Sequence, residues 1–114
     1  MDAAPAGLIE MGDLTATAVH EVVEAFVRRD PETARRVIRG DSRINRLNDQ
    51  IIEGVTAKMK ESPPEWVEPG LALYAMTRHL ERIGDHATNV AEDVIFLVDG
   101  EVMRHHFPQP NSSE

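Results

Sequence analysis

The chain has 114 residues, of which 41% are hydrophobic, 4% are aromatic and none is cysteine, and its formal net charge is −8. This length suffices for one domain whose core is filled by aliphatic residues and Met, while the lack of cysteine excludes disulfides, thiolate metal ligands and a Cys nucleophile. The negative charge argues against nucleic acid as a partner, and without a membrane-span pattern or a signal-peptide pattern we expect a soluble, cytoplasmic protein.

The first half of the chain predicts two helices joined by a very short connection. Apolar residues at three- and four-residue spacing indicate a helix from about Leu8 to Arg29. Asp30 and Pro31 then end it and begin the next helix, with Asp30 as N-cap and Pro31 at the first helical position. The second helix is expected to run to about Lys60. Because the connection is so short, the two helices should be antiparallel neighbours.

The second half predicts a linker, a third helix and a tail. We expect the proline-rich segment 61–69 to be the linker, with Trp66 covering the end of the bundle. Ser62-Pro63-Pro64-Glu65 also has the form of a capping box, so the long helix starts either near Pro69 or earlier, with its first turns kinked at Pro69. The third helix should then run from about Gly70 to Val98 and end at Asp99-Gly100. These elements predict an all-α, up-down-up three-helix bundle at 8–103, preceded by a short lead at 1–7 and followed by a flexible tail at 104–114.

Oxygen-bearing side chains recur along one side of the third helix. At about 100° per residue, Glu81, Asp85, Asn89 and Glu92 fall in one narrow sector, away from the apolar side. Like charges at this spacing are mildly unfavourable, so the row favours either a hard cation or arginine partners. The alternative is a solvated face whose charges are neutralised by Arg78 and Arg82 along the same helix.

A second pair of this kind lies on the second helix. Asp41 and Asn45 have the same four-residue spacing as Glu81 and Asp85, and antiparallel helices or two subunits would bring the pairs together. Carboxylates combined with an amide oxygen suit Mg²⁺, Ca²⁺, Mn²⁺ or iron. We therefore predict a metal site whose candidate ligands are Glu81, Asp85, Asp41, Asn45 and Asn89.

Other kinds of site have weaker support. His79 and His86 lie away from Glu81 and near the apolar side, so we interpret them as boundary residues. The Glu-x-x-His motif of di-iron bundles does not occur, nor does a phosphate-binding glycine loop or a nucleophile elbow. We predict a non-enzymatic protein, with neither catalytic residues nor a bound organic cofactor.

The segment that contains Leu80-Glu81-Arg82-Ile83-Gly84-Asp85-His86, followed by Asn89 and Glu92, resembles the C-terminal signature of the PhoU family of phosphate-signalling regulators. Glu10-Met11-Gly12 and the run 41–45 extend the resemblance over most of the chain. The resemblance implies metal ions at the acidic motifs, including iron or zinc clusters. This chain departs from the family pattern at Asn45, where an acid is usual, and the loss of one anionic ligand weakens a multinuclear cluster.

The resemblance also implies a role. It implies a negative regulator of phosphate uptake whose partners are a phosphate ABC transporter and a membrane sensor histidine kinase. Family members typically carry two such repeats, so we expect this single repeat to form a homodimer through its uncovered apolar surface. Two alternatives stay open at this point: a carboxylate protein that stores or oxidises iron, and a purely structural helical dimerisation module.

Overall fold

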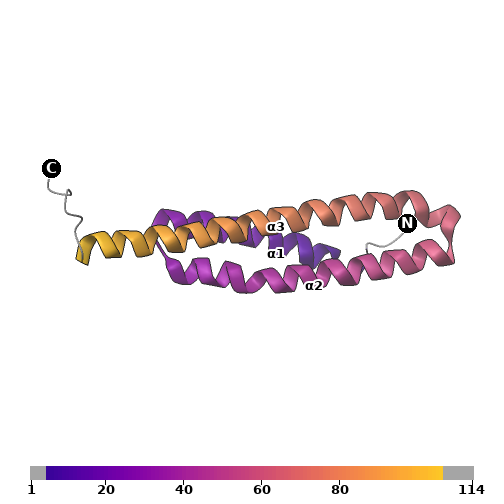
Figure 1. Ribbon diagram of the computed structural model, residues 1–114. Coiled ribbons are helices and arrows are strands. Elements are labelled where there is room, and N and C mark those ends of the chain that lie inside the picture. The colour runs from indigo at the N-terminus through magenta and orange to yellow at the C-terminus, as the bar shows by residue number, and fades with distance from the viewer. Residues whose placement is uncertain (1–4, 107–114) are drawn as a thin grey trace.

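A computed structural model of the protein describes residues 5–106, and for residues 102–106 it describes only the helical backbone. The described residues form three helices, α1 (Leu8–Arg28), α2 (Pro31–Glu61) and α3 (Pro63–His106). They run up, down and up in a rod of 70 × 19 × 17 Å (Figure 1). The predicted all-α three-helix architecture is therefore confirmed. No described helix combines the length and the apolar character that a membrane span needs.

The junction between α1 and α2 forms as the sequence predicts. Arg29 adopts a left-handed conformation (φ 54°) directly after α1 and reverses the chain. The Asp30 side chain then accepts hydrogen bonds from the backbone N–H groups of Glu32 (3.0 Å) and Thr33 (3.3 Å). The Thr33 hydroxyl also donates to Asp30 (2.7 Å), and this bond is the main reason that the pKa of the Asp30 carboxyl is lowered. The ionised carboxylate is thus the form that caps α2.

The third helix is longer than the predicted Gly70 to Val98 at both ends, and of the two starts that the sequence left open the earlier one is correct. Instead of a linker at 61–69, a single residue, Ser62, separates α2 from α3, and its carbonyl accepts from the N–H groups of Glu65 and Trp66. Pro63 begins the helix because a first-turn N–H needs no helical partner, and Pro69 lies inside it. At the other end the helix continues through Gly100 to His106, which takes it into the expected tail; residues 107–114 lie outside the described part of the chain.

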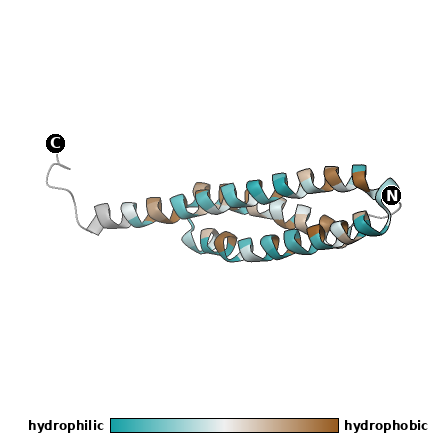
Figure 2. Ribbon diagram, turned by 45° about the vertical axis from the view of Figure 1, so that its right-hand side comes forward, coloured by the Kyte–Doolittle hydropathy of each residue, from teal (hydrophilic) through white to brown (hydrophobic). Residues whose placement is uncertain are grey.

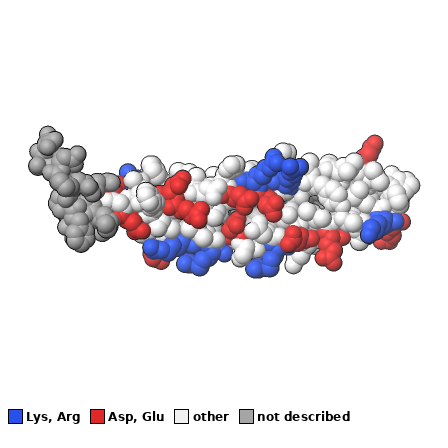
Figure 3. Space-filling model, in the orientation of Figure 1, with Lys and Arg blue, Asp and Glu red and all other residues white. Residues whose placement is uncertain are grey.

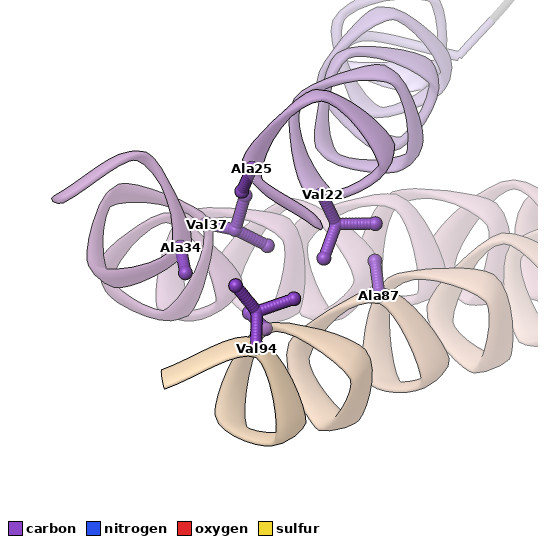
Figure 4. Close-up of a cluster of buried hydrophobic side chains, with 7 residues drawn as sticks. Val22, Ala25, Ala34, Val37, Ala87 and Val94 are labelled. Atoms are coloured by element: carbon purple, nitrogen blue, oxygen red, sulfur yellow. The ribbon is translucent and has the colours of Figure 1, made fainter. Parts of the chain in front are cut away.

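The core consists of two apolar clusters along the rod. Where all three helices meet beside the α1–α2 junction, small side chains point toward one another (Figure 4): Val22, Ala25, Ala34, Val37, Ala87, Ala91 and Val94. Toward the α2–α3 turn the second cluster has larger side chains, with Trp66 packed against it as predicted. It is made by Met11, Ile44, Leu47, Ile51, Val55 and Leu73. Figure 2 shows the matching alternation of apolar and polar residues along the helices.

Candidate binding site between α2 and α3

The polar residues singled out in the sequence lie where α2 and α3 pack against each other. From α3, the half-buried Glu81 carboxylate accepts a hydrogen bond from the side-chain amide of Asn48 (Nδ2 to Oε2, 3.2 Å). On α2, Asn45 donates to Asp41 (Nδ2 to Oδ2, 3.3 Å), and both residues are half-buried. The site therefore consists of two carboxylate–amide pairs, one within α2 and one that joins α2 to α3.

Gly84 on α3 faces α2 at this level. A Cβ atom placed on Gly84 would lie 3.5 Å from Ile44 Cδ1 and 3.9 Å from Asp41 Oδ1. The backbone of α3 therefore covers one oxygen of the Asp41 carboxylate, while the other oxygen accepts the Asn45 amide. The glycine within the α3 motif thus lies against Asp41, although the two residues are far apart in sequence.

Two buried oxygen atoms in this contact lack a hydrogen-bond partner among the described residues, namely Asp41 Oδ1 and Asn48 Oδ1. Buried acceptors normally have a donor or a cation beside them, so each marks a place where one would be stabilising. Positions 41 and 48 are seven residues apart, or about 10 Å along a helix. The two oxygens therefore cannot share a single bound ion.

The predicted ligands are only partly brought together. Asp41, Asn45 and Glu81 are half-buried, whereas Asp85 and Asn89 are exposed to solvent, as is Glu92. For Asp85 and Asn89 the reason is geometric: four residues turn a helix by 40° more than a full circle, so these two side chains rotate away from α2. Among the described residues, no three His, Asp or Glu side chains converge as a metal site. Metal binding stays a prediction.

The alternative prediction was that Arg78 and Arg82 neutralise the acidic residues of the same helix. Arg78 and Arg82 are exposed, and neither takes part in an ion pair within the described part of the chain. The ion pairs that do form lie elsewhere, mainly between α1 and α2 or within those helices. Asp85 and Glu92 therefore present their charges to solvent without a neutralising side chain from α3.

Sequence reasoning missed Asn48, the residue that connects the two helices. It is 7% exposed and lies on the apolar side of α2 between Ile44 and Ile51. An amide on an apolar stripe needs a buried hydrogen-bond partner, and that signal would have pointed to a polar group on the facing helix. The partner itself, Glu81, was identified.

Comparisons with known proteins agree with the fold and with the motif. The sequence model described as the PhoU domain matches residues 8–94. A relative from Xylella fastidiosa (strain 9a5c), named a phosphate-specific transport system accessory protein PhoU homolog, is 36% identical over 98 residues, which are 86% of this chain and 41% of the relative. One of the same name from Burkholderia sp is 31% identical over 107 residues, 94% of this chain and 45% of the relative.

The accessory protein PhoU of Serratia marcescens is 31% identical over 98 residues, which are 86% of this chain and 40% of that protein. The chain thus spans about two fifths of the length of the curated relatives that it matches. No solved structure matches it.

Proposed function

Because the chain belongs to the PhoU domain family, we propose that it is an accessory regulator of phosphate transport that acts by binding other proteins and has no enzymatic activity of its own. The observation that carries the proposal is the family match, which covers α1, α2 and α3 as far as residue 94. The matched range includes the polar residues of the candidate site, Asp41, Asn45, Asn48 and Glu81. The relatives' names describe accessory proteins of a phosphate-specific transport system.

The expected partners are the phosphate ABC transporter and the sensor histidine kinase, met on the cytoplasmic side. The surface we assign to them is the exposed row Asp85, Asn89 and Glu92 on α3. Its two carboxylates have no ion-pair partner among the described side chains. Figure 3 shows acidic side chains gathered along the rod in several places. A basic protein surface complements such a row and would be steered to it electrostatically.

The test is a binding measurement with the transporter ATPase and the kinase at two salt concentrations. Binding should weaken between low and high ionic strength, because exposed charges are screened within about 8–10 Å in salt. The double variant Asp85→Asn, Glu92→Gln should bind about tenfold more weakly at low salt, at roughly 0.7 kcal/mol per rim charge. Far-UV circular dichroism should show an unchanged helix content.

A matched control exists on another helix. Asp49 and Glu53 are exposed acids on α2, so Asp49→Asn, Glu53→Gln removes the same charge from a different face. This variant should bind as tightly as the unmodified chain. Equal weakening by both double variants would show that only net charge matters, which contradicts the assigned surface. No binding to either partner at low salt would contradict the adaptor role itself.

We further propose that Asp41 binds a cation. Its Oδ1 is buried and unpartnered, and Asn45 beside it carries an amide oxygen, so the pair suits one hard cation such as Mg²⁺ or Mn²⁺. Glu81 is held by Asn48, and Asp85 and Asn89 face solvent. The described residues do not fit a multinuclear iron or zinc cluster, and none of them favours iron storage or oxidation over the regulatory role.

A further inference from the structure

Basic side chains gather on one helix of this acidic chain. Five of the 12 Lys and Arg residues lie at positions 35–46 of α2, where the only acidic residue is Asp41. Asp41 is half-buried against α3 and does not share their surface. In Figure 3, blue side chains recur along the lower edge of the rod, where α2 lies in Figure 1. Positive charge is thus concentrated on α2 although the net charge of the chain is −8.

Four of these arginines form a row along the outside of α2. They are spaced three, four and three residues apart, so they extend over about 15 Å and fall within a sector about 80° wide. We call them the arginine row: Arg36, Arg39, Arg43 and Arg46, all of which are exposed. Side chains at this spacing meet a second helix that packs alongside the first. The row therefore matches a helical partner that runs along α2.

Half of the arginine row is already paired within the chain. Arg36 Nε lies 3.3 Å from Glu21, and Arg43 Nε lies 3.0 Å from Glu10. Arg39 and Arg46 have no ion-pair partner among the described residues. These two are seven residues apart, or about 10 Å along the helix, which is too far for one phosphate group to bridge. Each therefore suits a carboxylate of its own.

An apolar depression lies beside the row, between α1 and α2. Its volume is about 170 Å³, and Arg36 and Glu21 line it together with apolar side chains. Gly40 keeps it open, because a Cβ atom there would meet no atom within 4 Å. A cavity of about 150 Å³ holds a benzene molecule, whereas small-molecule sites have roughly 300–1,000 Å³. The depression therefore suits a single apolar side chain. Its apolar lining is Leu14, Ala18, Val37 and Ile44.

We propose that the arginine row binds an acidic helix of another protein, and that one apolar side chain of this helix occupies the depression. Carboxylates at three- and four-residue spacing complement Arg39 and Arg46, whereas a basic surface is repelled by them. The exposed row on α3, with Asp85 and Glu92, has the opposite charge, so the chain presents separate surfaces to acidic and basic partners. This inference does not depend on the role in phosphate transport, because it uses only the charges and the shape of α1 and α2.

The test uses a fluorescein-labelled, hydrocarbon-stapled helix of about 20 alanine-based residues, a length that supports a stable helix. It carries four glutamates at the spacing of the arginine row and one leucine beside them. This spacing is the same from either end, so the peptide fits both directions along α2. Fluorescence polarisation at low ionic strength should give a dissociation constant of about 10–100 μM. The same peptide with glutamine for glutamate should bind at least about tenfold more weakly.

The contribution of charge is tested on the protein with the double variant Arg39→Gln, Arg46→Gln. It should bind the glutamate peptide about tenfold more weakly. The matched control is Arg78→Gln, Arg82→Gln, which removes the same charge from exposed positions on α3. This control should bind as the unmodified chain does. Equal weakening by both double variants would show that only net charge matters and would overturn the proposal.

The contribution of the depression is tested with Gly40→Leu, which fills it from within the chain. Binding should weaken at least about tenfold, as the loss of a central anchor does. The thermal midpoint should not fall, because the position is open and leucine favours a helix more than glycine does. Gly54→Leu is the matched control: it adds the same side chain to an equally open position of α2 outside the depression, and it should bind normally.

Three further results would overturn the proposal. The first is no binding of the glutamate peptide at a concentration of about 1 mM. The second is normal binding by Gly40→Leu, or a loss in Gly54→Leu as large as that in Gly40→Leu. The third is binding to phosphatidylserine vesicles that requires Arg39 and Arg46 while the peptide does not bind, which would assign the arginine row to a membrane surface.

Discussion

At the scale of single residues, Asp41 and Asp85 carry the same carboxyl group in opposite surroundings. Asp41 is half-buried against Gly84 and has one oxygen without a partner, whereas Asp85 is exposed. A cation gains most where the oxygen it binds is already out of water and lacks a donor. Of the predicted ligands, we therefore propose Asp41, and not the Glu81–Asp85 motif, as the one that binds a cation.

We predict that Mn²⁺ or Mg²⁺ raises the thermal midpoint of the chain after chelator treatment. At a hundredfold excess over the dissociation constant, binding to the folded state stabilises it by about 2.7 kcal/mol. Asp41→Asn should abolish this rise, while Asp85→Asn should retain it. Scanning calorimetry with and without metal measures both. A response lost in Asp85→Asn would place the cation on the exposed row, and no response in the unmodified chain would contradict a cation site.

At the scale of helices, two buried glycines of α3 meet α2 in different ways. A Cβ on Gly84 would make ordinary contacts at 3.5–3.9 Å, whereas one on Gly70 would lie 2.5 Å from Met59 Sδ and 3.3 Å from Val55 Cγ1. Gly84→Ala should therefore stabilise the fold by about 0.5–1 kcal/mol, the helix propensity that glycine lacks. Gly70→Ala should destabilise it by about 1–2 kcal/mol, because Met59 must move within a packed contact.

Urea unfolding of the two variants provides the measurement, and each is the other's control because the same methyl group is added to the same helix. If Gly84→Ala lost stability, the close approach of α2 at Asp41 would need a bare backbone. That outcome would contradict the contact distances on which the prediction rests.

The sequence predicted helix ends well where the signal is local and poorly where it is not. Asp30 and Pro31 act within one turn, so the last residue of α1 and the first residue of α2 are predicted to within one residue. Proline and glycine often end helices, but α3 continues through Pro69 and Gly100. Packing against α2 stabilises the turn at Pro69, and the Arg29–Glu101 ion pair lies beside Gly100. Glu81 was identified, but the sector of α3 that faces α2 depends on how the helices pack, so the spacing alone did not predict that Asp85, turned 40° further, would be exposed.

At the scale of the whole molecule, the helices have unequal lengths. α1 has 21 residues and α3 has 44, or about 31 and 66 Å at 1.5 Å per residue. The Arg29–Glu101 pair aligns the end of α1 with the late part of α3. The last turns of α2 and the first turns of α3 therefore extend beyond α1 as a two-helix hairpin (Figure 1).

The hairpin is held by fewer buried side chains than the three-helix part. Val55 and Leu73 are the buried apolar residues nearest its tip, joined by the half-buried Met59, Trp66 and Tyr74. The Thr56 and Tyr74 hydroxyls add one hydrogen bond across it. Segments with few buried contacts open locally at a lower free energy than the core does.

We predict that backbone amides in 57–70 exchange with deuterium at least about tenfold faster than those in 84–94, which corresponds to an opening free energy lower by about 1.4 kcal/mol. Val55→Ala should speed exchange in the hairpin and leave 84–94 nearly unchanged, whereas Val94→Ala should speed exchange throughout, because it removes a side chain from the three-helix cluster. Hydrogen-exchange mass spectrometry resolves both segments. Equal protection of the two would mean that the rod unfolds as one unit, and that the absence of α1 beside the hairpin costs it no stability.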